Sequence, residues 1–389
     1  MTQDSNRLAL WALFAGNFII GTGVILPAGM LNDLSAGLGV SPATAGLLMI
    51  VGGLVCGFGA PLLAMFTSRI DRRMLLAGSL AFYAVGHGLS ALAPDFTSLV
   101  ALRAATVISA AIFTPQAAAT VGLMLPPEKR AAAVAFIFIG WSIASVAGMP
   151  CGSLIAAYAG WRTAYALMAV LALVSAVLVW RTLPRGLALP PMSLSTWRAV
   201  FFDPVLILIL LVTLASGSGQ FTLSGYLVVI YKEVLGASPG VIALLLAGFG
   251  LAGVTGNFLA ARFVGKLGVE RLILCALGTI LLGLIVFWSS FGIIAGAAIS
   301  VALWGLGTFS SNSLQQSRLI VHAPALASAS VALNTSTIYL GQAIGAATGA
   351  RLIANHELTH LAPVAAVFLI IAIALTLLAG HYTARIRKI

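Results

Sequence analysis

Ionisable side chains are rare inside the long apolar stretches of this sequence, and three of them suit proton transfer. His87 lies within one stretch, Arg103 lies within another in the segment LRAATV, and Asp33 follows the first stretch. A histidine has an unperturbed pKa of about 6.5, so it can exchange a proton near neutral pH. An arginine such as Arg103 could hold the Asp33 carboxylate ionised. The alternatives are structural: a packing histidine and a helix-end acid.

The composition places these residues in a membrane protein. Of the 389 residues, 61% are hydrophobic and only 7% are charged, whereas a soluble domain carries roughly 25% charged residues. The net charge of +11 does not indicate nucleic-acid binding, because the basic residues form short clusters between apolar runs. Such clusters set the orientation of membrane proteins. The apolar run after Arg7 lacks a small-residue cleavage signal and is interpreted as a retained span.

The three cysteines, Cys56, Cys151 and Cys275, all fall inside apolar runs without other metal-ligand types nearby. They therefore predict neither a disulfide framework nor a metal site. No nucleotide-binding motif is visible, so we expect no cofactor and no direct use of ATP.

The apolar runs have the length of membrane-spanning helices, which need about twenty residues each. Short alternating segments, the mark of a transmembrane barrel, are missing. We expect an all-α integral membrane protein with twelve spans in two pseudo-symmetric six-helix bundles. The predicted spans are 8–30, 43–66, 74–93, 98–124, 131–157, 163–183, 204–231, 239–263, 271–289, 292–314, 327–354 and 361–382.

The longest segment without a span, residues 184–203, contains three prolines and lies at mid-chain. It predicts a cytoplasmic linker between an N-terminal bundle, residues 1–183, and a C-terminal bundle, residues 204–389. The loop TSRIDRR in the first half is echoed by ARFVGKLGVER in the second, as in transporters with duplicated halves.

Basic residues predict the orientation of the chain. The N-terminus, the loops that follow even-numbered spans, and the C-terminal tail hold sixteen of the twenty Lys and Arg residues. Both termini are therefore expected to be cytoplasmic. Arg103 lies elsewhere, inside a span, where a charge costs about 2.5–3.5 kcal/mol near the bilayer centre. It should face a cavity or a partner, unless it snorkels to the nearby outer end.

Small residues recur at four-residue spacing in four spans, one in each group of three. Gly148, Pro150 and Gly152 belong to the stripe in the fifth span, where proline and glycine also weaken the helix. Such stripes let helices approach closely, and they predict that spans 2, 5, 8 and 11 form a seam between the halves along which two bundles rock. Static packing and a rigid kink are the alternatives. The stripes are Gly52, Cys56 and Ala60; Ala144, Gly148 and Gly152; Ala252, Gly256 and Ala260; and Gly341, Gly345 and Gly349.

Several segments together resemble the major facilitator superfamily, specifically its twelve-span drug:proton antiporter branch, which includes sugar, arabinose and purine efflux pumps. The resemblance covers nearly the whole chain. The matching segments are LNDLSAGLGVSPATAGLL (31–48), LSALAP (89–94), PPEKRAAAV (126–134), GMPCG followed by GWR (148–162), QFTLSGYL (220–227), LAGVTGNFLAARF (251–263) and ALASASVALNTSTIYLGQAIGAATGA (325–350).

The resemblance implies two groups of functional residues. A basic motif after the second span, here Arg69, Asp71, Arg72 and Arg73, would latch the cytoplasmic side, although Ser68 replaces the usual aspartate. A plain orientation signal is the alternative. Arg103 would match an arginine linked to proton transfer. Many relatives carry a glutamate in the first span, however, where this chain has Val24.

In the superfamily, spans 1, 4, 7 and 10 line a central cavity. Uncharged hydrogen-bonding groups among aromatic residues suit a neutral or amphipathic solute; helix–helix hydrogen bonding is the alternative. Asn257 and Asn334 are interpreted instead as seam contacts. The candidate substrate-binding residues are Asn17, Phe18, Thr114, Gln116, Gln220, Phe221, Thr222, Tyr226, Trp304, Phe309, Asn312 and Gln315.

The resulting hypothesis is a secondary transporter of the cell (inner) membrane that exports a small neutral or amphipathic solute by alternating access, with proton-coupled antiport. The expected partners are the solute, protons and the lipid bilayer, with no nucleic acid, and the protein should act as a monomer. A uniporter or importer on the same fold is the first alternative. A membrane receptor or an enzyme is the second, but no paired catalytic groups lie at membrane depth and no soluble signalling domain is attached.

Overall fold

The computed structural model describes residues 3–67, 69–187 and 194–386, and within these ranges every regular element is a helix. Eleven helical segments of the described residues are long and apolar enough to cross a bilayer. A twelfth helix, α17 (Ala327–Ala354), has 28 residues, which is also enough to span a core about 30 Å thick. The prediction of an all-α protein with twelve spans is confirmed.

The helices follow the predicted spans closely. In the first half they are α1 (Gln3–Gly29), α2 (Leu31–Leu38), α3 (Pro42–Ala45), α4 (Leu47–Phe66), α5 (Arg72–Ala91), α6 (Phe96–Thr106), α7 (Ile108–Met124), α8 (Pro127–Ile143), η1 (Ala144–Gly148), α9 (Met149–Ala159) and α10 (Trp161–Thr182). The remaining helices are α11 (Leu194–Phe202), α12 (Pro204–Ser224), α13 (Leu227–Glu233), α14 (Pro239–Leu267), α15 (Val269–Ser289), α16 (Ile294–His322), η2 (Pro324–Leu326), α17, η3 (Leu358–His360) and α18 (Leu361–Ile386).

Several of the few acidic residues begin helices, which explains why they lie at the ends of apolar runs. Asp71, Asp95 and Asp203 accept hydrogen bonds from backbone N–H groups in the first turns of α5, α6 and α12, the usual role of an N-cap. The Asp95 cap also lowers the pKa of its carboxyl group, chiefly through the hydrogen bond from the Ser98 N–H. These carboxylates serve the helix ends at which they stand.

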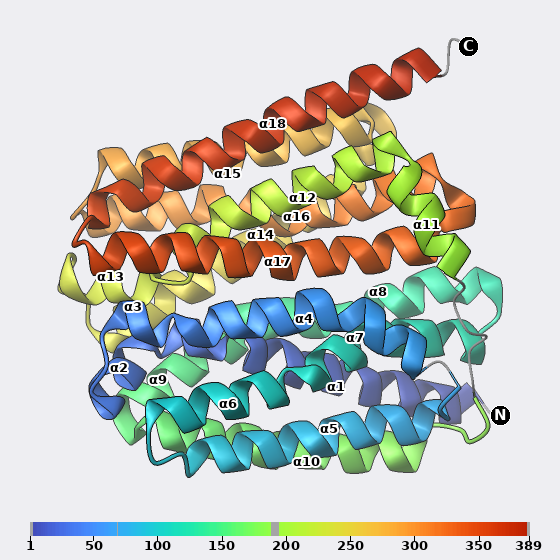
Figure 1. Ribbon diagram of the computed structural model, residues 1–389, viewed down its shortest axis with the longest axis horizontal. Helices are drawn as coiled ribbons and strands as arrows, with labels where there is room; N and C mark the ends of the chain where they lie inside the picture. Colours follow the sequence, from blue (N-terminus) through green and yellow to red (C-terminus); the bar gives the residue numbers. More distant parts are fainter. Residues whose placement is uncertain (1–2, 68, 188–193, 387–389) are drawn as a thin grey trace.

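The helices form two bundles, with α1–α10 below and α12–α18 above in Figure 1. Each bundle has its own large hydrophobic cluster, one around Tyr83 and Phe113, the other around Ile280 and Trp304. Of the predicted linker, residues 188–193 lie outside the described residues, and α11 forms most of the remainder. That short helix was not predicted. The exact boundaries of halves and linker stay predictions.

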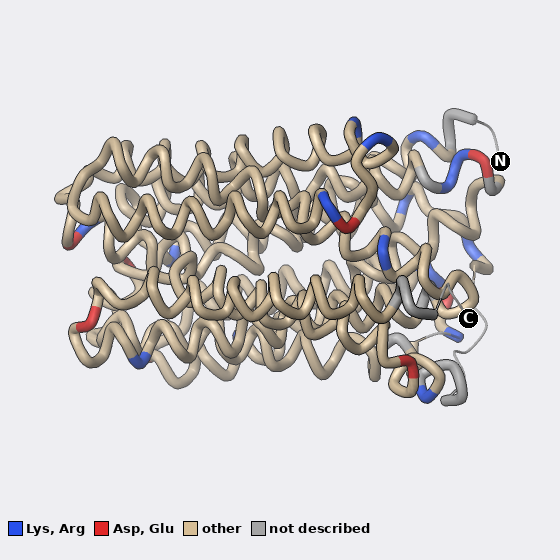
Figure 2. The backbone as a smooth tube through the Cα atoms, turned by 90° about the horizontal axis from the view of Figure 1, so that it is seen from above, with Lys and Arg blue, Asp and Glu red and all other residues tan. Residues whose placement is uncertain are grey.

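Charge is distributed unequally along the bundle axis. Figure 2 shows that Lys and Arg gather at the end of the molecule where both termini lie. We call this the termini end and the opposite one the far end. Both termini lie at the same end, as expected for an even number of spans, because each span carries the chain from one end of the molecule to the other.

The seam consists of two helix pairs that join the halves, α4 with α17, and α14 with η1 and α9. A Cβ atom on Gly53 would lie 2.6 Å from the Tyr339 carbonyl oxygen and 2.8 Å from the Ala343 nitrogen. On Gly250 it would lie 2.8 Å from backbone atoms of Ser145 and Val146. Both pairs therefore touch backbone to backbone, and they are the second, eleventh, fifth and eighth spans expected at the seam.

The predicted glycine stripes, however, face the wrong neighbours. A side chain on Gly148 or Gly152 would overlap Thr22 or Leu26 of α1, in the same half. Likewise, Gly256 packs against Leu306 of α16, and Gly345 against the backbone of α12. Four-residue spacing identifies one face of a helix but not the helix it meets. The assignment of Gly148 and Gly152 to the seam surface is therefore corrected: they join their helix to α1.

Pro150 follows the π-helical turn η1, in which the Met149 N–H bonds to the Ala144 carbonyl five residues earlier. Such wide turns occur singly and bend a helix. The wide turn precedes a buried proline that cannot donate a hydrogen bond of its own. The same turn presents Ser145 and Val146 to Gly250 across the seam. The weak helix formers of the fifth span thus coincide with a change in helix geometry at the seam.

Replacing Gly250 with alanine is expected to lower the apparent melting temperature of the purified protein, because the added methyl group would push the backbones of α14 and η1 apart. Overpacking of this kind costs about 1–3 kcal/mol. Gly248 on the same helix is exposed, with open space around it, so Gly248→Ala should leave stability unchanged or raise it. Equal behaviour of the two variants would contradict a close approach at the seam.

Candidate functional site

Arg103 on α6 is 2% exposed and holds three helices together. Its Nη1 donates to the Gly23 carbonyl at 2.8 Å, its Nη2 to the Val24 carbonyl at 2.7 Å, and its Nε to the Leu48 carbonyl at 3.4 Å. Arg103 therefore neither snorkels to the surface nor pairs with a carboxylate. Backbone oxygens of α1 and α4 bind the cation.

One of these carbonyls is available because of Pro27, which lies inside α1. Gly23 is four residues before Pro27, so its carbonyl is the one that proline deprives of a helical N–H donor. Gly52 of α4 leaves room for the guanidinium, since a Cβ there would lie 3.3 Å from Arg103 Nη2. We call Arg103 with the carbonyls of Gly23, Val24 and Leu48 the arginine clamp.

His87 lies beside the clamp. Its ring is 1% exposed, and neither ring nitrogen has a hydrogen-bond partner. It packs edge-on against Tyr83 at 4.3 Å and is stacked on Tyr165 at 5.5 Å between ring centroids. A Cβ on Gly23 would lie 2.7 Å from His87 Nε2. Two of the three proton-transfer candidates, Arg103 and His87, therefore meet at one turn of α1.

Asp33 stands apart from both. It is half-buried on α2 at the far end, and burial raises the pKa of its carboxyl group, while the positive charge of Lys232 opposes that rise. Lys232 belongs to α13 in the other half. The expectation that Arg103 holds Asp33 ionised is corrected. The three hydrogen bonds that the Arg103 side chain donates all go to the clamp carbonyls, and none goes to Asp33.

The basic motif at the termini end joins parts of the first half. Arg72 is fully buried and donates to the Gln116 side-chain oxygen on α7 and to the Thr67 carbonyl. The Arg73 guanidinium lies 4.6 Å from the ring centroid of Trp180 on α10. Asp71 caps α5 and also accepts a hydrogen bond from the Gly186 N–H at the start of the linker.

The second half has an equivalent connection between its third and fourth helices, the ninth and tenth spans, but there the arginine belongs to the other helix of the pair. Arg318 near the end of α16 is 6% exposed and donates to Glu270 at the start of α15, at 3.1 Å. In the first half the arginine stands at the start of the third span; here it stands near the end of the tenth. The remaining members of the motif add little: Arg69 is exposed, and Ser68 lies outside the described residues.

The predicted substrate residues occur in separate groups rather than around one described cavity. Trp141 donates to Thr114 at 3.3 Å, and Trp304 to Gln220 at 3.4 Å. Phe309 packs against Gly253, Phe221 is half-buried, and Thr222 donates to the Ser218 carbonyl of its own helix. Their role in substrate binding stays a prediction.

Asn334 and Asn312 form a polar chain inside the second half. The Asn334 amide donates to Asn312 of α16 at 3.2 Å and accepts from Thr213 of α12 at 2.7 Å. Asn334 is therefore not a contact between the halves, which corrects its assignment to the seam. Helix α17, which carries Asn334, packs against α12 of its own half and against α4 of the other half. The Asn334 side chain lies on the face that meets its own half. Asn257 is half-buried on the seam helix α14.

Two buried amides have atoms without partners. Asn17 of α1 donates to the Leu13 carbonyl, but its side-chain oxygen has no donor. Neither amide atom of Gln315 on α16 has a partner, although the residue is only 2% exposed. Buried polar groups are nearly always satisfied. These two are therefore available to a hydrogen-bonding ligand.

The far ends of the two halves are in contact. The Asn32 amide on α2 donates to the Val228 carbonyl on α13 at 2.9 Å. Tyr226 is fully buried, donates to the Ala346 carbonyl at 2.7 Å, and presses on Gly46, where any side chain would overlap its hydroxyl. Tyr226, predicted to bind substrate, thus lies where the halves close on one another. We call the Asn32–Val228 and Gly46–Tyr226 contacts the far gate.

Comparison with known proteins identifies the architecture. A profile of the Major Facilitator Superfamily matches residues 13–346. The chain belongs to the major facilitator superfamily. It is 31% identical over 348 residues to the inner membrane transport protein YdhP of Escherichia coli O157:H7, covering 88% of both chains. It is 28% identical over 359 residues to a probable sugar efflux transporter of Helicobacter acinonychis, covering 92% of this chain and 91% of the relative.

Solved structures agree on the fold. A bacterial homologue of the human lysosomal transporter Spinster, crystallised inward-facing and unoccupied, superposes with a TM-score of 0.73 at 17% identity and covers 98% of both chains. The protein is thus a multi-pass membrane transporter of the superfamily, and a small molecule is its substrate. Among the described residues, no cluster of three or more His, Cys, Asp or Glu side chains has the arrangement of a metal site.

Three residues that position this transporter's site escaped the sequence analysis. Pro27 and Gly46 have no polar side chain, and nothing in the composition around Asn32 distinguishes it from an ordinary loop residue. A signal for Pro27 was present, since a proline four residues after Gly23 always frees that carbonyl in a continuous helix.

The clamp can be tested by double substitution. Arg103→Leu should destabilise the protein because the Gly23 carbonyl loses its donor, at a cost of about 1–3 kcal/mol. Pro27→Ala supplies a helical N–H to the same carbonyl, so the double variant should melt at a higher temperature than Arg103→Leu alone. In the parent chain Pro27→Ala should give no such gain. Additive effects across the cycle would show that the two residues are not coupled.

The far gate makes a second prediction. Gly46→Ala should separate the far ends, since the methyl group would overlap the Tyr226 hydroxyl. Tyr226→Phe removes that hydroxyl and should restore closure. The yield of disulfide between Asn32→Cys and Val228→Cys, with Cys151 and Cys275 replaced by serine, reports contact. An unchanged yield in Gly46→Ala would mean that the gate does not depend on this glycine.

Proposed function

We propose that this transporter exports a small neutral or amphipathic solute by alternating access, in exchange for protons. The observation that carries the choice of solute is a pair of buried amides with unsatisfied atoms, the side-chain oxygen of Asn17 on the first span and both amide atoms of Gln315 on the tenth. Hydroxyl or carbonyl groups of an uncharged solute would satisfy them. A polycation would instead require carboxylates, and the acids of this chain lie outside the middle of the spans.

The direction of transport is proposed from the relatives. One is named a probable sugar efflux transporter and another an inner membrane transport protein. We propose the same location and direction here, with both termini cytoplasmic because basic residues crowd the termini end. The protein acts as a monomeric carrier, not as an enzyme, and does not bind nucleic acid.

The halves rock about the seam. Gly53 and Gly250 leave two close backbone contacts there, about which the neighbouring helices tilt. Opening of the far gate separates Asn32 from Val228 and Gly46 from Tyr226, and so exposes the interior to the side opposite the termini. The basic motif and the Arg318–Glu270 pair keep the termini ends of the individual bundles intact during this motion.

Protons enter the cycle through His87. In the structure its partnerless ring lies at the turn of α1 that Arg103 binds. A proton on the ring would place a second positive charge beside Arg103, and like charges repel strongly in a medium of low dielectric. Protonation therefore weakens the arginine clamp and lets α1 move. Asp33 on α2 and Lys232 on α13 contribute opposite charges to the far gate.

Uniport is the second candidate, favoured by the arginine clamp. The clamp satisfies Arg103 without any titrating group, and Val24 stands where the family resemblance leads us to expect a glutamate. A carrier with this clamp alone would move its solute downhill and ignore the pH gradient.

Proteoliposomes distinguish the two candidates. With a panel of neutral sugars, nucleosides and dyes, an imposed pH gradient should drive accumulation of the transported solute by the parent protein. His87→Gln keeps a polar side chain that cannot titrate, so it should retain solute exchange and lose the response to the gradient. Solute flux that ignores the gradient in the parent protein would establish uniport in place of antiport.

Asn17→Ala and Gln315→Ala should each raise the KM for the solute by about two- to tenfold, the value of one uncharged hydrogen bond. The matched control is Thr255→Ala, whose exposed hydroxyl bonds only to the Leu251 carbonyl of its own helix. A KM unchanged in both amide variants would remove these residues from the solute site.

A further inference from the structure

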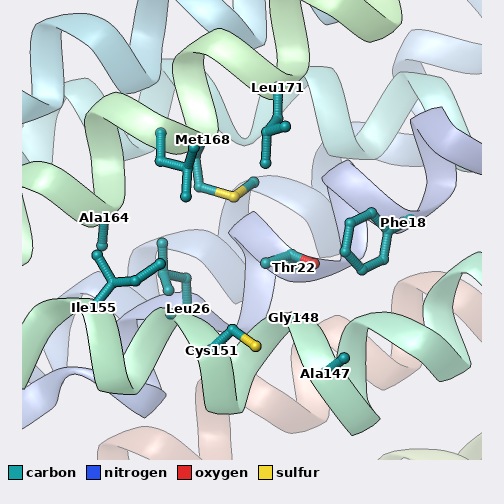
Figure 3. Close-up of a pocket in the computed structure, with 12 residues that line it drawn as sticks. Phe18, Thr22, Leu26, Ala147, Gly148, Cys151, Ile155, Ala164, Met168 and Leu171 are labelled. Atoms are coloured by element: carbon teal, nitrogen blue, oxygen red, sulfur yellow. The ribbon is translucent and has the colours of Figure 1, made fainter.

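A cavity of about 130 Å³ lies beside α1, and its lining includes none of the residues of the far gate or the clamp. Its walls come from α1, from η1 and α9, and from α10, as Figure 3 shows. Small residues form one wall, Ala147, Gly148 and Gly152, and Thr22 and Leu26 of α1 pack onto the two glycines. The cavity is a gap between the first, fifth and sixth spans.

The cavity opens toward the membrane. Leu167 and Leu171, one turn apart on α10, line it with 41% and 36% of their surfaces exposed, and the exposed thiol of Cys151 lies on the opposite wall. In a membrane-spanning helix such exposed apolar residues face lipid. A molecule dissolved in the bilayer can therefore reach the cavity without passing through the transport pathway.

Thr22 is the only residue with a hydroxyl group in the lining of this apolar space. Thr22 is 5% exposed, and its hydroxyl has no hydrogen-bond partner; Figure 3 shows its oxygen on the cavity side, close to Phe18. Buried threonines of the fourth span such as Thr106 and Thr120 donate to the carbonyl four residues earlier, Leu102 at 2.6 Å and Gln116 at 2.7 Å. Thr22 does not, so its hydroxyl is left for a ligand.

We propose that this cavity binds a small membrane-dissolved alcohol or phenol, with the apolar body in the gap and the hydroxyl on Thr22. The volume suits a benzene-sized body, since an apolar protein cavity of about 150 Å³ holds benzene. Water is a poor occupant, because a buried water needs two to four polar partners and Thr22 is one. A lipid chain would fill the space and leave the hydroxyl unsatisfied, at a cost typical of a buried polar group.

The parent protein carries its own reporter and control. Alkylation by N-ethylmaleimide, followed by mass spectrometry of the cysteine peptides, measures Cys151 in the cavity wall and exposed Cys275 on α15 in one sample. Saturating phenol should slow alkylation of Cys151 by about tenfold, because the bound molecule shields the thiol in proportion to occupancy. Cys275 should react at an unchanged rate.

Toluene and Thr22→Val test the hydroxyl. Toluene has nearly the shape of phenol without the hydrogen bond, so phenol should protect Cys151 at about two- to tenfold lower concentration. In Thr22→Val, which keeps the side-chain shape, that difference should disappear while protection by toluene remains. Equal slowing of Cys151 and Cys275 would indicate a general effect of the solvent on the membrane and overturn the proposal. Equal protection by phenol and toluene in the parent protein would assign the cavity to hydrocarbon chains instead.

Discussion

The interior of a bilayer offers no water, so a backbone carbonyl or a charge placed there is costly unless it finds a partner within the protein. The arginine clamp meets this constraint for two groups at once. Pro27 leaves the Gly23 carbonyl without a helical donor, and Arg103 brings a buried cation that needs acceptors. Each satisfies the other, and in doing so they tie α6 to α1 and α4. The relative positions of three spans thus depend on a single guanidinium and on a glycine, Gly52, that makes room for it.

Close helix contacts at glycine occur both within the halves and between them. Inside a half, Gly256 meets the backbone of Leu306 and Gly345 meets the backbone of α12, whereas Gly148 receives the Thr22 side chain. At the seam, Gly53 and Gly250 meet backbone atoms of the opposite half, whereas Gly57 receives the Leu340 side chain. Glycine therefore permits close approach throughout the molecule, and the kind of contact does not by itself distinguish the seam from the interior of a half.

Hydropathy was sufficient to predict the twelve spans, because length and apolar content are properties of each segment alone. Spans 2, 5, 8 and 11 do make the contacts between the halves, although the small-residue stripes from which that was predicted face other helices. The neighbour that each helix face meets was not predictable. The stripe through Gly148 and Gly152 meets α1, and the seam contact comes from Ser145 and Val146, which lie in a π-turn that residue spacing does not predict. The partners of Arg103 were missed for a related reason. A search for carboxylates does not find backbone carbonyls, although Pro27 marks one of them.

In the proposed exchange of solute for protons, Val24 in place of an acid would change how a proton acts on the transporter. Where an arginine pairs with a carboxylate, proton uptake cancels a negative charge and leaves the cation unpaired. Here the Arg103 cation is already satisfied by neutral carbonyls, and a neutral ring, His87, lies against the same turn of α1. Proton uptake on that ring would add a charge instead of cancelling one. Two like charges in a dry interior are unstable together, so the protonated state favours whichever arrangement admits water between α6 and α1. Coupling of this kind requires only that the ring titrates differently when the clamp is closed and when it is open.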